Sequence, residues 1–336
     1  MVDEIPPLPP IPERLRVAAT EGTLIPFVGA GLSKLGGCPD WNEFAVGSLR
    51  FFVDRGKIDY SYLEQLKTVS ARVKLSLARG LEAEHSALID YRTLLTPTGG
   101  TAVARGTRAY DGLSKLANVF VTTNYDEWLD TPPSQAATSN TEAAGSASAP
   151  VIRRNVYYKV EDLTYDKLNT PNTVLHIHGS IKDRKSMVVT TSDYLARYAN
   201  HQVGATPREN GYLVFLEMLF RLKNVLFIGY SLEELEILEY VVQKARDAKT
   251  TAAPVKGRRE EPQHFMLQGF YSHQRALVGS LGKYFADEIG VQLLPFSRDK
   301  KDWEQLIEVI EHLANEVPTG SILSLQKRAE LRSLLE

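Results

Sequence analysis

The chain has 336 residues, of which 43% are hydrophobic, 24% charged and 9% aromatic. Its 39 basic and 41 acidic residues give a formal net charge of −2. This composition excludes a disordered chain. The balanced charge leaves no net electrostatic field that would attract nucleic acid or an anionic membrane. The length suits one large α/β domain with an inserted subdomain.

The first residues of the chain do not predict export. Residues 1–12 are acidic and Pro-rich, where a secretory signal needs basic charge and an apolar stretch. No later run approaches the length of a transmembrane helix, and the single cysteine, Cys38, excludes an intramolecular disulfide and a Cys-rich zinc site. We therefore expect a cytoplasmic protein, in a reducing compartment and without a membrane segment.

Short apolar runs alternate with helical patterns along the chain. Six runs, nearly continuous in hydrophobicity, predict buried strands at 24–28, 119–121, 174–178, 225–228, 265–267 and 291–294. Helical patterns lie at 12–21, 211–223, 232–248 and 302–315. The alternation predicts an α/β protein with a Rossmann-like, doubly wound, mainly parallel six-stranded sheet.

The first two predicted strands are separated by about ninety residues, far more than a right-handed crossover needs. We therefore predict an inserted helical subdomain over 42–110, with 1–41 and 111–336 forming the Rossmann-like domain. The segment 131–150 has no Leu, Ile, Val or aromatic residue, so it cannot bury a core face and is interpreted as a mobile loop.

A glycine turn follows the first predicted strand and contains Gly29, Ala30, Gly31 and Ser33. Glycines at such a turn let the backbone approach a pyrophosphate, whose charge is stabilised by amide groups at the next helix start. The third glycine of the dinucleotide fingerprint is missing, since position 34 is a lysine. A tight turn without a ligand is therefore the alternative interpretation of this motif.

Polar residues crowd the end of the second predicted strand, in the order Thr122-Thr123-Asn124-Tyr125-Asp126. Asp126 can cap a following turn, and Thr122 and Thr123 can bond to the backbone. Asn124 has the stronger functional interpretation, because its amide offers both a donor and an acceptor to a sugar hydroxyl or a water.

Two histidines lie at the end of the third predicted strand. Strand alternation puts His176 and His178 on the same face, with His178 nearer the carboxyl edge and followed by Gly179. His178 is thus the candidate general base, while His176 is interpreted as a satisfied packing residue beneath it. No carboxylate or cysteine at suitable spacing completes a metal site with this pair, so no metal is expected.

A glycine and two hydroxyl groups also follow the fourth predicted strand, in Gly229-Tyr230-Ser231. Ser231 can cap the helix predicted at 232–248, with Glu234 completing a capping box, and such a helix start can still face a ribose or a phosphate. Because open α/β sheets bind ligands at the carboxyl ends of their strands, we expect the four clusters to converge on one site.

Together these motifs resemble the sirtuin superfamily, and more closely its bacterial sirtuin-like antiphage-defence NAD⁺ hydrolases. The matching stretches, in the family's order, are 29–33, 37–41, 122–126, 178–180, 192–194 and 229–231. The resemblance implies a Rossmann-like sheet that binds NAD⁺, with Asn124 and His178 carrying catalysis. The residues that it implies for binding the dinucleotide are Gly29, Ala30, Gly31, Ser33, Asp40, Trp41, Thr123, Asp126, Gly229, Tyr230 and Ser231.

Two departures distinguish the chain from the protein deacylases that it resembles. Those enzymes usually carry a structural zinc on four cysteines, and this chain has one cysteine. Their Pro-Asp-Phe-Arg element reads Pro39-Asp40-Trp41-Asn42 here, without the arginine. Both differences disfavour peptide deacylation.

The resemblance therefore implies an NADase, a hydrolase that cleaves NAD⁺ to nicotinamide and ADP-ribose and depletes cellular NAD⁺ in abortive infection. Because unregulated hydrolysis would kill the cell, we expect a homo-oligomer and a separately encoded partner, such as a HerA-like DNA-translocating ATPase or a phage-sensing protein. The inserted helices at 42–110 are the expected contact surface.

Other functions remain open from the sequence. They are a non-catalytic sensor or scaffold that binds NAD⁺ or ADP-ribose, and a protein deacylase or ADP-ribosyltransferase. A hydride-transfer dehydrogenase fits poorly, because the opening loop lacks the dinucleotide fingerprint and its ribose-binding acid.

Overall fold

A computed structural model describes residues 4–131, 154–198, 210–230 and 263–317, and the backbone of 201–203 and 206–208. Three sequence predictions lie outside the described residues: the loop at 131–150 except for its first residue, the helix at 232–248, and Ser231. The described residues include Asn124, His178 and the glycines of both predicted turns.

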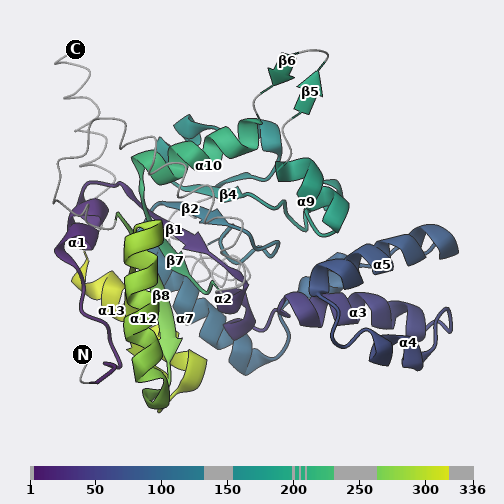
Figure 1. Cartoon of the computed structure of the whole chain (residues 1–336), viewed down its shortest axis with the longest axis horizontal. Coiled ribbons are helices and arrows are strands. Elements are labelled where there is room, and N and C mark those ends of the chain that lie inside the picture. The colour runs from purple at the N-terminus through teal and green to yellow at the C-terminus, as the bar shows by residue number, and fades with distance from the viewer. Residues whose placement is uncertain are drawn as a thin grey trace, which may run out of the picture.

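A parallel sheet forms the centre of the protein (Figure 1). Within the described residues its strand order is β3-β4-β2-β1-β7-β8-β9, and all neighbouring pairs are parallel. The strands are β1 (Leu24–Val28), β2 (Val119–Thr122), β3 (Asn155–Tyr157), β4 (Thr173–His176), β7 (Asn224–Ile228), β8 (His264–Phe270) and β9 (Val291–Ser297). A separate antiparallel pair consists of β5 (His201–Val203) and β6 (Thr206–Arg208). The predicted doubly wound α/β class is confirmed.

This central sheet has seven strands in the described residues, one more than predicted. The additional strand, β3, lies at the edge of the sheet, where Asn155 is exposed and Val156 and Tyr157 are half-buried. A short, partly exposed edge strand does not show the continuous hydrophobicity by which the six buried strands were predicted. The third predicted strand was also too long, because β4 ends at His176 rather than at 178.

The chain changes its direction of winding between β1 and β7, which lie side by side near the middle of the sheet. From β1 it passes to β2 and β4 on one side, and from β7 to β8 and β9 on the other. Val28 pairs with both Thr122 and Ile228, so these three strands end level with one another. Such a switch point, outside the carboxyl ends of the strands, is where open α/β sheets bind their ligands.

Helices cover both faces of the sheet. One face packs against α10 (Gly211–Leu222) and α12 (Arg275–Tyr284), and the other against α1 (Glu13–Thr20), α2 (Ala30–Leu35), α7 (Gly100–Leu116) and α13 (Gln305–Glu316). Along β1, Ile25 and Phe27 face the first layer, while Leu24 and Val28 face the second. Phe27 is fully buried with its ring centre 5.3 Å from that of Phe227, and its truncation to alanine would cost about 3–5 kcal/mol.

The predicted helices at 12–21, 211–223 and 302–315 correspond to α1, α10 and α13, whereas the sequence analysis did not predict α12. Helix α9 (Thr191–Tyr198) follows β4. Short helical turns occupy Val160–Asp162, Tyr165–Asn169, Arg184–Ser186, Ser272–Gln274, Phe285–Ile289 and Asp302–Glu304.

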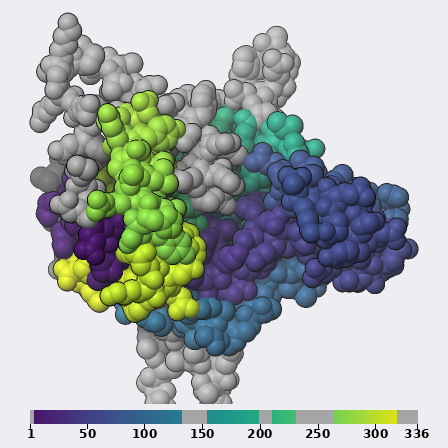
Figure 2. Space-filling view, turned by 60° about the horizontal axis from the view of Figure 1, so that its bottom comes forward, coloured from purple at the N-terminus to yellow at the C-terminus, as the bar shows by residue number. Residues whose placement is uncertain are grey.

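Four of the helices between β1 and β2 share a hydrophobic core cluster with Tyr125, Met187 and Val189 of the sheet domain. These helices are α3 (Trp41–Val53), α4 (Tyr60–Gln65), α5 (Ala71–His85) and α6 (Tyr91–Leu95). They form a lobe on one side of the sheet domain, seen in blue in Figures 1 and 2. The predicted boundary at 110 falls inside α7, which packs on α13 with Gly112 against Ile310.

The glycine turns after β1 and β7 pack too closely for larger residues. A Cβ on Gly31 would lie 2.8 Å from the carbonyl oxygen of Gly229, which itself has a φ of +69°. We expect Gly31→Ala to lower the free energy of unfolding by about 1–3 kcal/mol in urea titrations, because the two turns must separate.

The matched control is Gly80→Ala in α5, where an added Cβ meets no atom within 4 Å. This variant should gain up to about 1 kcal/mol, because alanine favours a helix interior over glycine. Equal stability of the Gly31→Ala variant and the parent would show that the two turns tolerate a methyl group.

Candidate active site

The turns at the carboxyl edge of the sheet contact one another. The amide of Gly31, after β1, donates to the carbonyl of Gly229, after β7, at 2.9 Å. The side chain of Asn124, after β2, donates to the carbonyl of Gly29 at 3.0 Å. The ring of His176, at the end of β4, lies 2.8 Å from the carbonyl of Asn124. The structure therefore brings the four predicted clusters to one edge.

Asn124 is held in one orientation by its neighbours. Its Nδ2 donates to Gly29 O and to Ser33 Oγ at 3.0 and 2.8 Å, and its backbone amide donates to Thr122 Oγ1 at 2.9 Å. Within the described residues its buried Oδ1 has no hydrogen-bond partner. A buried acceptor left without a partner costs about 1–3 kcal/mol, which a ligand hydroxyl or a water would offset.

His178 also has a buried atom without a partner. Its Nε2 lies 3.0 Å from the hydroxyl of Tyr198, which in turn lies 3.0 Å from the hydroxyl of Tyr212. Its Nδ1 has no partner in the part of the chain that the structure describes. Asn124 Oδ1 and His178 Nδ1 are together called the open atoms.

The imidazole of His178 is neutral at physiological pH. Burial, and then the positive charges of Arg197 and Arg72, lower its pKa to about 3. A neutral imidazole has one nitrogen able to accept a proton, but a pKa this far below neutrality makes His178 a weaker base than an ordinary histidine. Tyr194 contacts the ring edge-on with the two ring centres 5.3 Å apart, and the guanidinium of Arg72 lies over Tyr194.

The prediction that both histidines project to the same face is wrong. Because β4 ends at His176, strand alternation does not extend to His178. The imidazole of His178 contacts the hydroxyl of Tyr198, which in turn contacts the hydroxyl of Tyr212. Tyr212 lies in α10 and belongs to the same hydrophobic cluster as Leu175 of β4. His176 follows Leu175 in the strand and faces the opposite layer, against Asp130.

His176 itself is satisfied, as predicted. Its side chain is fully buried, with Nδ1 2.8 Å from Asn124 O and Nε2 2.8 Å from Asp130 Oδ1. Burial alone would lower the pKa of His176, but the hydrogen bond and negative charge of Asp130 raise it above its ordinary value.

A pocket of about 30 Å³ opens beside Asn124, large enough for one or two water molecules. Its lining is Ala30, Ser33, Cys38, Pro39, Asp40, Trp41, Phe44, Leu95, Thr123, Asn124, Tyr125 and Asp126. Trp41 and Tyr125 meet edge-to-face there, with ring centres 5.7 Å apart. A dinucleotide needs several hundred Å³, so its binding must widen this pocket.

The acidic and thiol groups of the pocket are buried or already hydrogen-bonded. Burial raises the pKa of Asp126, whose Oδ1 accepts from the Trp128 amide at 3.1 Å, as in the predicted turn cap. Burial, and then the charge of Asp126, raise the pKa of the Cys38 thiol, which excludes it as a thiolate nucleophile at neutral pH. Asp40 caps α3 in a capping box with Glu43.

The remaining predicted binding residues have structural contacts. Gly31 and Gly229 bond to each other, and Tyr230 packs on Phe27 while its hydroxyl donates to Thr123 Oγ1 at 3.1 Å. Their positions at the switch point still allow contact with a ligand. Ser231 lies outside the described residues.

Tyr194 lies in one of the matching stretches, whereas Tyr198, Tyr212 and Tyr110, which also support the site, were not predicted. Tyr194 and Tyr198 are four residues apart in α9, a spacing that places both on one helix face and could have indicated a shared partner. Tyr212 and Tyr110 gave no such signal, because their contacts with Tyr198 and Ser33 join segments distant in the sequence.

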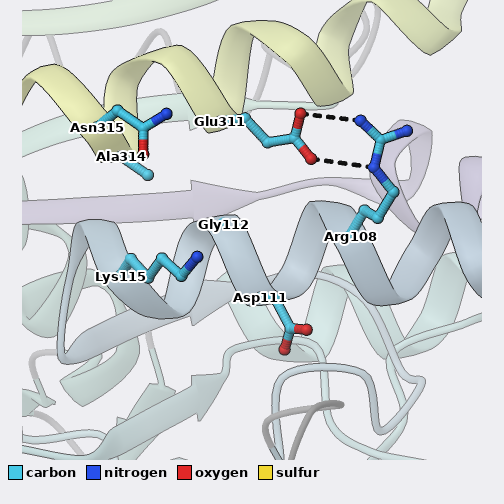
Figure 3. A pocket seen from close by; sticks show the side chains of 7 residues that line it. All are labelled: Arg108, Asp111, Gly112, Lys115, Glu311, Ala314 and Asn315. Atoms are coloured by element: carbon cyan, nitrogen blue, oxygen red, sulfur yellow. Dashed lines mark hydrogen bonds and ion pairs between the residues drawn. The ribbon is translucent and has the colours of Figure 1, made fainter.

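A second and larger cavity, of about 310 Å³, lies between α7 and α13 (Figure 3). Arg108 and Glu311 form a two-point ion pair across it, at 3.0 and 2.9 Å. This cavity lies between outer-layer helices rather than at the strand ends, so it is not the ligand site expected for this fold.

Neither a metal cluster nor a membrane helix is found among the residues that the structure describes. No three His, Cys, Asp or Glu side chains there are grouped so as to hold a metal ion. No helix in the same residues is long and apolar enough to cross a membrane.

The lowered pKa of His178 predicts a pH-dependent stability. Below about pH 6.5 a histidine of the unfolded chain binds a proton that folded His178 does not, so stability should fall as the pH is lowered toward 3. His178 contributes at most about 1.4 kcal/mol per pH unit to the slope of the unfolding free energy against pH. Urea unfolding between pH 7 and pH 5 should show a shallower slope for His178→Gln than for the parent.

The exposed His273→Gln provides the matched control, since it also removes one imidazole. Its slope should follow that of the parent. Identical slopes for the parent and His178→Gln would mean that His178 titrates normally in the folded protein.

Comparison with known protein families gives a match to the SIR2-like domain over residues 118–286. The match covers half of the chain and includes Asn124, His178 and the glycine turn after β7, while the turn after β1 precedes it. No curated protein matches the chain.

Proposed function

The chain belongs to the SIR2-like domain family, whose members are NAD⁺-dependent enzymes, and we propose that it hydrolyses the N-glycosidic bond of NAD⁺. The observation that carries this proposal is the pair of open atoms, one on each candidate catalytic side chain. An amide oxygen and an imidazole nitrogen suit the hydroxyls of a ribose and the protons of an attacking water.

The reaction places few demands on acid catalysis. Water attacks the anomeric carbon of the ribose, and the electrons of the C–N bond return to the pyridinium ring, so nicotinamide leaves as a neutral molecule. Asn124 Oδ1 accepts from the water or a ribose hydroxyl. His178 Nδ1 accepts the proton that the water loses, directly or through that hydroxyl, and releases it to solvent.

Two observations favour water over an acylated peptide as the acceptor. The pocket beside Asn124 has room for one or two water molecules. Asn42, in the place of the arginine of the deacylase element, accepts a hydrogen bond from Lys74 of the inserted helix α5 at 2.7 Å. Asn42 is thus engaged with the inserted helix α5 rather than presented to a substrate.

The test is an incubation of purified protein with NAD⁺, with nicotinamide and ADP-ribose separated by chromatography over time. Steady release of nicotinamide without any peptide supports hydrolysis. Saturable binding in calorimetry with no nicotinamide would establish a sensor instead, and release that requires an acyl-lysine peptide would establish a deacylase.

We further propose that the enzyme is a cytoplasmic antiphage effector controlled by assembly. Depletion of NAD⁺ harms the cell that makes the enzyme, so activity must await a trigger. Large apolar side chains on the inserted subdomain, Tyr60, Val73 and Leu88, are 58%, 42% and 76% exposed and support this lobe as a contact surface. They would meet a second copy or a separate partner, for which a HerA-like ATPase or a phage sensor is the candidate.

Size-exclusion chromatography with activity measurements tests this control. An oligomer whose hydrolysis rises on addition of the partner is the expected result. A monomer that hydrolyses NAD⁺ at full rate alone would remove the need for a partner.

A further inference from the structure

His176 contacts the backbone of Asn124 and takes no part in the NAD⁺ hydrolysis proposed above. Its Nδ1 is 2.8 Å from the backbone oxygen of Asn124, and its Nε2 is 2.8 Å from Oδ1 of Asp130. A backbone carbonyl only accepts hydrogen bonds, so Nδ1 must carry a hydrogen. Asp130 also forms an ion pair with Lys182, which keeps its carboxyl ionised, so Nε2 must carry a hydrogen as well.

Both ring nitrogens donate only when the imidazole is positively charged. We propose that His176 is a positioning residue for Asn124, held as an imidazolium between the Asn124 carbonyl and the Asp130 carboxylate. The inference rests on the proposed function, since it concerns the same catalytic amide. It also gives the two histidines opposite charge states, with His176 charged and His178 neutral.

The geometry explains how a buried cation positions Asn124. The pairing of Thr122 with His176 across β2 and β4 sets the imidazole level with the turn. Asn124 is then fixed at its backbone amide by Thr122 and at its side chain by Gly29 and Ser33, so His176 supplies the remaining anchor at the carbonyl. A displacement of about 1 Å at a reacting group can cost about 10²-fold in rate.

The acidic groups around His176 favour the imidazolium. The cations Lys182 and Arg154, both near Asp130, oppose a further positive charge and help to keep Asp130 ionised. Asp130 contacts His176 directly, with Lys182 and Glu127 behind Asp130, and Asp126 contributes a further negative charge when ionised. When the pH rises through the raised pKa of His176, one of its two hydrogen bonds must be lost. The value of kcat/KM should therefore fall at alkaline pH, because the carbonyl of Asn124 loses its hydrogen bond from His176.

The direct test is the ¹⁵N NMR spectrum of the imidazole of His176 in the parent protein at pH 7, without NAD⁺. The expected result is two protonated ring nitrogens. A single protonated nitrogen overturns the inference, whether or not the protein hydrolyses NAD⁺. The absence of nicotinamide release would instead overturn the proposed function, so the two failures are distinguishable.

The companion variant is Asp130→Asn, which keeps an acceptor oxygen but removes the charge. In this variant we expect one protonated nitrogen on His176. We also expect kcat to be at least tenfold lower with a nearly unchanged KM, and the alkaline fall (alkaline limb) of the kcat/KM profile to begin at a lower pH than in the parent. Asp130→Glu should restore the two protonated nitrogens and the position of the limb. Arg108→Gln, which removes an ion pair between α7 and α13, is the control and should change none of these readouts.

The outcome that contradicts the role of Asp130 is an Asp130→Asn variant whose alkaline limb and nitrogen signals match those of the parent. If Asp130→Asn does not fold, the spectrum of the parent protein alone decides the charge of His176.

Discussion

Asn124→Ala is expected to lower the rate of nicotinamide release from NAD⁺ by about 10²–10³-fold, the usual loss when one preorganised polar group is removed from a reacting centre. The variant loses Oδ1, the open atom that would accept from the ribose or the attacking water. It also loses the Nδ2 donor that holds Gly29 O and Ser33 Oγ. Chromatography of nicotinamide after a fixed incubation measures the effect.

Asn124→Asp separates the two functions of the amide. It keeps an oxygen in the place of Oδ1 but sets a second carboxylate oxygen against the carbonyl of Gly29, so it should be as slow as Asn124→Ala. The exposed Asn155→Ala, on the edge strand β3, is the control and should keep the parental rate. A folded Asn124→Ala variant with parental activity would exclude the assigned role.

His178→Ala should reduce kcat by about 10²–10⁴-fold, the range that a positioned general base contributes. His178→Gln should be equally slow, because an amide fills the space without accepting a proton at neutral pH. Tyr198→Phe removes the hydroxyl that lies 3.0 Å from Nε2 but keeps the ring, so a smaller loss of about tenfold is expected.

Steady-state kinetics on these variants separates kcat from KM, and circular dichroism checks their fold. His273→Gln, at the surface, should behave as the parent. A His178→Gln variant with parental kcat would mean that proton transfer does not pass through this imidazole.

The part of the fold that could be predicted from the sequence is the part determined by burial on two faces. β1 has the apolar sequence Leu-Ile-Pro-Phe-Val because both of its faces are buried. Ile25 and Phe27 pack against the helices on one face of the sheet, and Leu24 and Val28 pack against the helices on the other. The edge strand β3 lacks this double burial and was missed. Helix α12 was also missed, since Val278 is its one fully covered apolar side chain among residues 275–284.

The location of the candidate residues at one edge of the sheet could be predicted more fully than their contacts. Thr122 ends β2, Asn124 follows β2 and His178 follows β4, and the parallel sheet brings these strand ends to one edge. The pKa shifts of the two histidines could not be predicted, because they depend on contacts between distant segments: Asp130 with His176, and Arg72 with the Tyr194 ring beside His178. The faces of the two histidines were mispredicted because a turn begins right after His176.

A crystal structure of the protein with ADP-ribose tests the role of the open atoms most directly. We predict that the hydroxyls of the terminal ribose lie within about 2.6–3.2 Å of Asn124 Oδ1 and His178 Nδ1, with the pyrophosphate at the turn after β1. A terminal ribose that touches neither atom, or ADP-ribose bound in the cavity between α7 and α13, would contradict the proposed chemistry.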